Sequence, residues 1–126
     1  MAPFTILLVE DDIDVREALV EALHDKGYPV DCAFDGEHAL QTLRGGLRPG
    51  VILLDLMMPR MDGTEFRRAQ RDDPALADLP VVLLSADARM DEKARTLKVQ
   101  GAVRKPIDLV QLYRVIEGIR LSKTSA

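Results

Sequence analysis

Polar residues follow four apolar runs of the sequence at the point where each run ends. Carboxylates follow two of the runs, a hydroxyl follows the third, and two basic residues with a proline follow the fourth and weakest. In chain order these groups are Glu10-Asp11-Asp12 after Ile6–Val9, Asp55 after Val51–Leu54, Ser85 after Val81–Leu84, and Arg104-Lys105-Pro106 after Ala102–Val103. Ligands of parallel sheets bind outside the carboxyl ends of the strands, so we expect these side chains to form one compact site.

The carboxylates of this set predict a site for a divalent cation. Glu10, Asp11 and Asp55 would crowd negative charge into one cleft, and like charges at close range raise each other's pKa unless a cation neutralises them. Their oxygens suit Mg²⁺, which binds one or two carboxylates together with a phosphate and keeps several waters. Lys105 adds a positive charge, which completes the electrostatic arrangement of a phosphoryl-transfer site. A carboxylate can itself be the nucleophile and form an aspartyl phosphate.

Each of these groups also has an ordinary structural interpretation. Acidic residues after a strand are often helix N-caps, and that interpretation is favoured for Glu10–Asp12 taken alone. A single Asp at a strand end is more often a turn residue, Ser85 by itself could cap a helix, and Lys105 by itself is a solvated charge. One group at each strand end is hard to obtain by chance, so the joint arrangement favours function.

The elements that must position these groups alternate along the chain. The apolar runs predict strands, and three of them are continuous, which is typical of strands covered on both faces in a parallel sheet. The segments between them show helical spacing, as at Val15, Leu19 and Leu23. The predicted strands are 6–9, 30–34, 51–54, 81–84 and a weaker one around 102–103; the predicted helices lie near 15–23, 39–43, 63–70, 89–99 and 109–116. This order predicts a doubly wound α/β fold with helices on both faces of the sheet.

Composition fits a single soluble domain. The chain has 126 residues, is 47% hydrophobic and carries a net charge of −4, which argues against a dedicated nucleic-acid-binding domain. No stretch reaches the ~20 apolar residues of a membrane helix, no signal peptide is present, and the lone Cys32 fits a reducing cytoplasm. We expect one domain over 4–121 and a frayed tail over 122–126, with no other domain attached. The basic stretch Phe66-Arg67-Arg68 and Arg71 is interpreted as a solvated helix face, and the alternative is a docking patch for an acidic partner.

The ordered set resembles the receiver domains of two-component response regulators over nearly the whole chain. The matching segments are ILLVEDD (Ile6–Asp12), VILLDLMMPRMDG (Val51–Gly63), VVLLSA (Val81–Ala86) and VRKPIDLVQL (Val103–Leu112). The spacings are 44 residues from Asp11 to Asp55, 30 more to Ser85 and 20 more to Lys105. The resemblance implies a (βα)5 flavodoxin-like three-layer sandwich with a five-stranded parallel sheet.

The resemblance also implies a role for each residue of the set. Asp55 would take a phosphoryl group from a histidine of a partner kinase or phosphotransfer protein. Asp11 and Asp55 would ligate Mg²⁺, with Glu10 acting mostly through bound water and the backbone carbonyl of Met57 completing the ligands. Lys105 would pair with the acceptor carboxylate and then with the phosphate, and Ser85 would hydrogen-bond a phosphoryl oxygen. The remaining expectations are a cis bond before Pro106 and a loop shaped by Pro59 and Gly63.

One position departs from the family pattern. Three residues before the lysine the family usually has Tyr or Phe, which swings inward on activation, whereas this chain has Ala102. Ala has no rotamers to switch, so the aromatic half of the usual coupling is missing. We expect the face around Ala102 to signal by loop movement alone; the alternative is that another surface or altered dimerisation reads the phosphorylation.

Three functions compete at this stage. The first is a phosphorylation-driven switch in a two-component system or phosphorelay, which acts through a downstream protein as a monomer or weak dimer, without contacting nucleic acid or membrane. The second is a metal-dependent phosphohydrolase with Asp55 as nucleophile, but such enzymes usually carry an acidic residue two positions later, where this chain has Met57. The third is a binding module that keeps the fold and no longer switches, which only Ala102 supports. We favour the switch, which is not a turnover enzyme.

Overall fold

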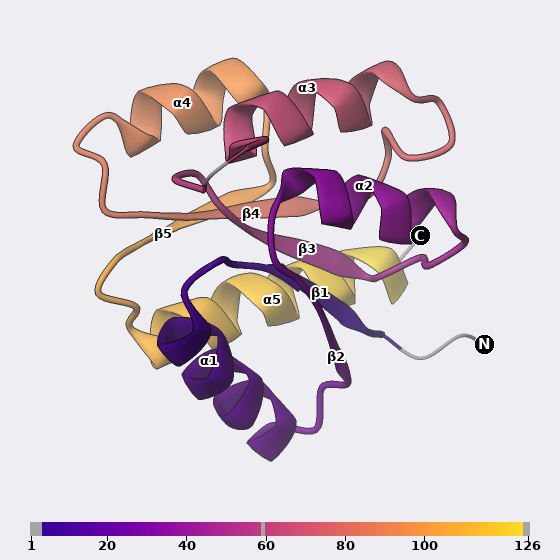
Figure 1. The fold of residues 1–126 in the computed structure, drawn as a ribbon. Helices are drawn as coiled ribbons and strands as arrows, with labels where there is room; N and C mark the ends of the chain where they lie inside the picture. Colours follow the sequence, from indigo (N-terminus) through magenta and orange to yellow (C-terminus); the bar gives the residue numbers. More distant parts are fainter. Residues whose placement is uncertain (1–3, 59, 125–126) are drawn as a thin grey trace.

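A central parallel sheet organises the molecule, and helices alternate with its strands along the chain (Figure 1). The computed structural model describes residues 4–58 and 60–124. The elements are β1 (Ile6–Val9), α1 (Ile13–Asp25), β2 (Val30–Ala33), α2 (Gly36–Arg44), β3 (Val51–Asp55), α3 (Gly63–Asp72), β4 (Val81–Ser85), α4 (Met90–Leu97), β5 (Gly101–Arg104) and α5 (Leu109–Thr124). The strand order is β2-β1-β3-β4-β5, and all pairings are parallel. The prediction of a doubly wound, flavodoxin-like fold is therefore confirmed.

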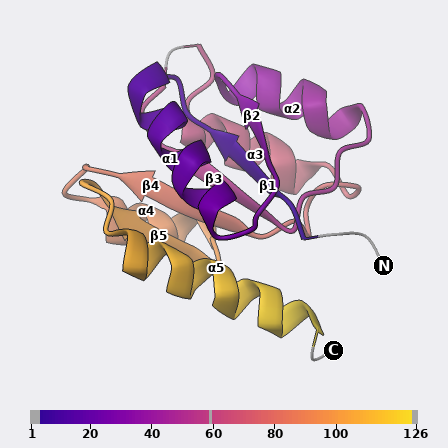
Figure 2. The same ribbon diagram turned by 90° about the horizontal axis from the view of Figure 1, so that it is seen from below.

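The helices cover both faces of the sheet, which explains why the strands are apolar without alternation. Helices α1 and α5 lie on one face, and α2, α3 and α4 lie on the other (Figure 1 and Figure 2). Along β1, Ile6 and Leu8 join the core under α1 and α5, whereas Leu7 and Val9 join the core on the opposite face. All four side chains are fully buried. The three central strands β1, β3 and β4 are buried along their whole length and are apolar except where they end, whereas the edge strand β2 carries the exposed Asp31.

Some element boundaries differ from the sequence prediction. The second strand stops at Ala33, one residue early, because Phe34 turns outward and is 52% exposed. Helix α4 is shorter than predicted because Lys98 adopts a left-handed conformation (φ 53°) that ends the helix. Helix α5 continues through Thr124, so the tail expected from residue 122 begins within a helix, and residues 125 and 126 lie outside the described part of the chain.

The register of the strands brings the candidate residues to one edge of the sheet. Val9 pairs with Leu54, so Glu10 and Asp55 occupy equivalent places at the carboxyl ends of β1 and β3. On the other side of β3, Ser85 and Arg104 pair across β4 and β5. The strand order reverses direction between β1 and β3, and ligands of open α/β sheets bind at such a point. Among the helices that the structure describes, none combines the length and apolar character that a membrane crossing requires.

Candidate functional site

Three carboxylates converge at the end of β1 and β3. Glu10, Asp11 and Asp55 each offer an oxygen, and these oxygens all lie within 4.8 Å of one another. Glu10 and Asp55 are buried, with 0% and 3% of their surface exposed, whereas Asp11 faces solvent. The cluster therefore has a buried floor and an open side through which an ion or a substrate can enter.

The third member of the acidic triplet has a different role. The Asp12 carboxylate accepts hydrogen bonds from the amides of Asp14 (2.9 Å) and Val15 (3.2 Å), and so caps the N-terminus of α1. The capping interpretation of the triplet is correct for Asp12. Glu10 and Asp11 remain available to the carboxylate cluster.

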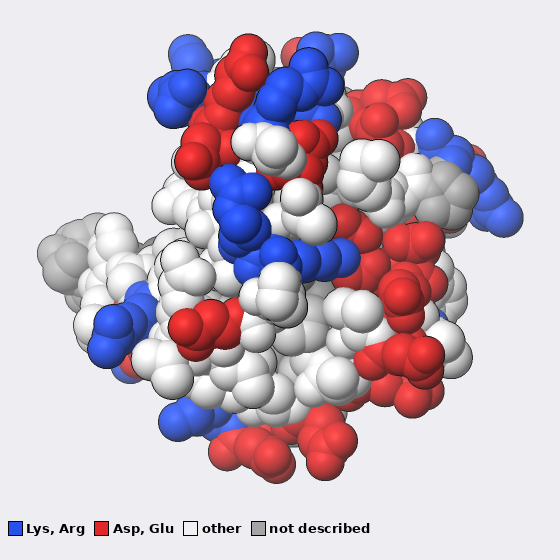
Figure 3. All heavy atoms as spheres, turned by 90° about the vertical axis from the view of Figure 1, so that its left-hand side faces the viewer, with Lys and Arg blue, Asp and Glu red and all other residues white. Residues whose placement is uncertain are grey.

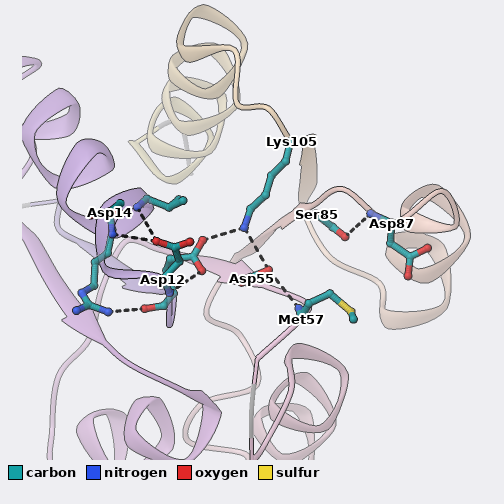
Figure 4. A network of polar contacts seen from close by, with 10 residues as sticks. Asp12, Asp14, Asp55, Met57, Ser85, Asp87 and Lys105 are labelled. Carbon is teal, nitrogen blue, oxygen red and sulfur yellow. Dashed lines mark hydrogen bonds and ion pairs between the residues drawn. The ribbon is translucent and has the colours of Figure 1, made fainter.

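Lys105 reaches into the cluster from the end of β5 (Figure 4). Its Nζ lies 2.9 Å from Glu10 Oε1 and 3.5 Å from Asp55 Oδ1. The Lys105 backbone amide donates to the carbonyl of Ser85 (2.9 Å), which extends the pairing of β4 and β5. The Lys105–Pro106 peptide bond is cis, the geometry that the resemblance implies.

The charges of this cluster do not balance. Burial raises the pKa of Glu10, and the nearby Asp55 carboxylate raises it further, against the opposing effect of Lys105. Burial lowers the pKa of Lys105, but its hydrogen bonds with Glu10 and the charge of Asp55 outweigh burial and raise it. Two buried carboxylates thus compete for one ammonium.

On the face of the molecule that carries this edge, acidic side chains gather on one flank and basic ones lie in the middle (Figure 3).

The donor set fits Mg²⁺. All three clustered ligands are carboxylate oxygens, which hard cations prefer, and no His or Cys belongs to the group found among the described residues. Because burial already raises the pKa of Glu10, an added positive charge would favour the ionised carboxylate.

Two further candidates lie beside the cluster. The Met57 amide donates to Asp55 Oδ1 (3.1 Å), while the Met57 side chain is 67% exposed, so its thioether points away from the carboxylates. The Ser85 hydroxyl is buried and accepts from the amide of Asp87 (2.9 Å), so its oxygen is turned toward Asp87 (Figure 4).

The loop after Asp55 is built by close backbone packing. Gly63 donates its amide to the carbonyl of Leu56 (3.1 Å), and a Cβ at Gly63 would lie 2.6 Å from the carbonyl oxygen of Asp55. Asp62 and Glu65 form a capping box at the start of α3. The expected role of Gly63 in this loop is therefore visible in its contacts, whereas Pro59 lies outside the described residues.

Ala102 lies in β5, where it pairs with Leu83 and packs, partly buried, against the core under α2, α3 and α4. Its side chain is a methyl group, which has no hydrogen-bond donor or acceptor for the β4–α4 loop. Arg104, two residues later, does reach that loop, since its Nη1 donates to the carbonyl of Asp87 (3.0 Å).

Sequence reasoning was wrong about one basic residue. Arg67 is not on a solvated face, because it is only 3% exposed and donates to the carbonyls of Leu97 (3.0 Å) and Lys98 (2.8 Å). Burial lowers the pKa of this guanidinium. Arg68 and Arg71 are exposed, as expected. One feature of the sequence could have indicated that Arg67 is buried. Gln70 lies one helical turn after Arg67, and its side chain accepts the third hydrogen bond of the guanidinium (2.8 Å).

Comparison with known proteins agrees with the geometry of the site. Residues 6–117 match the family described as response regulator receiver domain. The chain is 41% identical over 126 residues to the response regulator MprA of Mycobacterium sp. (strain KMS), and 39% identical over 122 residues to the response regulator PleD of Caulobacter vibrioides. These alignments cover 98% and 90% of this chain, but only 53% and 25% of the two relatives. The chain thus spans about half the length of the MprA relatives that it matches.

Solved structures share the fold along almost the whole chain. The chemotaxis protein CheY4 of Vibrio cholerae superposes with a TM-score of 0.84 at 28% identity, covering 94% of this chain and 99% of that protein. The bacteriophytochrome response regulator AtBRR superposes with a TM-score of 0.82 at 31% identity, covering 94% of both chains. Family match, sequence identity and fold therefore agree: this chain belongs to the response regulator receiver domain family.

Proposed function

We propose that Asp55 accepts a phosphoryl group from a phosphohistidine of a histidine kinase or histidine phosphotransfer protein. Receiver domains interact with histidine kinases. The observation that carries the proposal is the placement of the Asp55 carboxylate, which is 3% exposed, belongs to the carboxylate cluster and lies 3.5 Å from the Lys105 ammonium. In the transfer, an Asp55 oxygen forms a bond to phosphorus while the bond from phosphorus to the imidazole nitrogen breaks. That nitrogen keeps the electron pair and takes up a proton.

The neighbouring residues have separate roles in this reaction. Lys105 holds Asp55 before the transfer and pairs with a phosphoryl oxygen after it, because one ammonium can bridge both groups. The Ser85 hydroxyl donates a hydrogen bond to another phosphoryl oxygen. Glu10, Asp11, Asp55 and the backbone carbonyl of Met57 would hold the Mg²⁺ ion. When bound, Mg²⁺ supplies the positive charge that offsets the carboxylates and the phosphoryl oxygens.

The output of the switch passes to a downstream protein. We predict that the domain spans residues 4–121 and that it is a monomer or weak dimer. We also predict that it is cytoplasmic and makes no direct contact with nucleic acid. The acidic net charge of −4 supports a protein partner over nucleic acid.

Incubation with a small acyl phosphate and Mg²⁺ tests the proposal by intact-protein mass spectrometry. The parent protein should gain one phosphoryl group, and the Asp55→Asn variant should gain none. Asp72→Asn removes an exposed carboxylate on α3 and should be labelled like the parent. Labelling that persists in Asp55→Asn, or no labelling of the parent, would exclude Asp55 as the acceptor.

A further inference from the structure

The loop between β4 and α4 is held at Asp87. The Asp87 amide donates to the Ser85 hydroxyl, as described above, and its carboxylate turns toward its own helix. There it accepts from the amide of Arg89 (2.8 Å) and from the ammonium of Lys93 (3.0 Å). These contacts fix the loop to Ser85 on one side and to the start of α4 on the other.

Arg104 ties the same residue to a different strand. Arg104 pairs with Ser85 across β4 and β5, and its Nη1 donates to the carbonyl of Asp87 (3.0 Å). A second contact, from Nη2 to Asp91 at 3.9 Å, joins two exposed side chains and contributes little. The bond to Asp87 is therefore the contact through which β5 restrains the loop.

We propose that Arg104 is a positioning residue that holds the β4–α4 loop while the Ser85 hydroxyl faces Asp87, and that it releases the loop when Ser85 binds a phosphoryl group on Asp55. This inference rests on the proposed function of Asp55. Ser85 and Arg104 bind the amide and the carbonyl of one residue, so a rotation of Ser85 toward Asp55 removes one of the two restraints that β4 and β5 place on Asp87. Ala102, with only a methyl group, leaves this role on β5 to Arg104.

Coupling between two interactions is reciprocal. If the binding of a phosphoryl group by Ser85 weakens the hydrogen bond from Arg104 to Asp87, that hydrogen bond must weaken the binding of the phosphoryl group by the same free energy. Removing the guanidinium should therefore strengthen the binding of a phosphoryl mimic. The loss of a positive charge near the pocket acts in the opposite direction, since it weakens the binding of an anion. The sign of the change thus separates release of the loop from a simple charge effect.

The test is a calorimetric titration of Mg²⁺-loaded protein with beryllium trifluoride as the phosphoryl mimic. At about 1 M ionic strength the screening length is about 3 Å, so long-range charge effects are small. Arg104→Met should bind the mimic about two- to tenfold more tightly than the parent, the range expected for one hydrogen bond. Arg95→Met removes an exposed arginine from the last turn of α4 and should leave the affinity unchanged.

A double-mutant cycle identifies the route of the effect. In a Ser85→Ala background, Arg104→Met should no longer change the affinity, because the hydroxyl that couples to Asp87 is absent. In the parent, the amide of Asp87 should also lose protection from hydrogen exchange when the mimic binds. An affinity that is unchanged or weaker in Arg104→Met, or a gain that persists without Ser85, would overturn the role of Arg104 alone. Failure of the parent to bind the mimic would overturn the proposed function and this inference together.

Discussion

At the scale of single residues, the pocket is a place where stability is given up for binding. Glu10 is fully buried, and its Oε1 and Oε2 accept from Lys105 (2.9 Å) and from the amide of Asp12 (3.3 Å). These two bonds do not offset burial and the neighbouring Asp55, so the pKa of Glu10 stays raised. A carboxyl group whose pKa is higher in the folded than in the unfolded protein destabilises the fold when it ionises.

This imbalance predicts how the stability of the metal-free protein depends on pH. The destabilisation by Glu10 is absent below its ordinary value of 4.5 and grows as the pH rises from there through its raised folded pKa. Glu10→Gln should therefore be more stable than the parent at neutral pH, by about 1.4 kcal/mol for each pH unit that separates the pKa of Glu10 in the folded protein from that in the unfolded protein. Urea unfolding in EDTA between pH 4 and pH 8 measures the difference. A difference that shrinks as the pH rises would show that Lys105 dominates the pocket.

At the scale of elements, the buried side chain of Arg67 joins helix α3 to helix α4. From α3 it donates to Leu97 and Lys98 at the end of α4, where a helix leaves its last carbonyls without internal partners. A buried guanidinium is tolerated there because the carbonyl dipoles of the helix end offset its charge. The position of α4, which carries the β4–α4 loop, thus depends on α3.

Arg67→Met should destabilise the protein by about 2–4 kcal/mol, because it leaves buried carbonyls without donors. Chemical denaturation measures this free energy. The neighbouring Arg68 is exposed, so Arg68→Met should change the stability by less than about 0.5 kcal/mol. If the two substitutions changed the free energy of unfolding equally, the role of Arg67 in holding α3 against α4 would be contradicted.

The comparison of these two arginines shows what a sequence can predict here. The strands and the pocket follow from local pattern, because Glu10, Asp55 and Ser85 each lie at a strand end and parallel register brings those ends together. Arg67 and Arg68 are identical in type and adjacent, and only the position of α4 in space decides which one is buried. The same limit applies to Arg104, whose contact crosses from one strand end to the loop of another.

At the scale of the whole molecule, the site lies where the two layers of helices diverge. The connection after β1 leads through α1 on one face of the sheet, and the connection after β3 leads through α3 on the other (Figure 1). The two loops that carry Glu10, Asp11 and Asp55 therefore separate at the strand ends and leave the carboxylates between them. An ion held by both loops is attached to both layers, so its binding free energy adds to the stability of the entire fold.

Addition of Mg²⁺ should accordingly stabilise the whole domain. At a Mg²⁺ concentration one hundred times the dissociation constant, the gain is about 2.7 kcal/mol if the unfolded chain does not bind the ion. Thermal unfolding followed by circular dichroism should show the melting temperature rising with Mg²⁺ at constant ionic strength. Asp11→Asn should abolish this rise, and it should cost little stability in EDTA because Asp11 is exposed. Asp14→Asn, an exposed change in the first turn of α1, should keep the rise. An equal Mg²⁺ response in parent and Asp11→Asn would mean that the ion binds somewhere other than the carboxylate cluster.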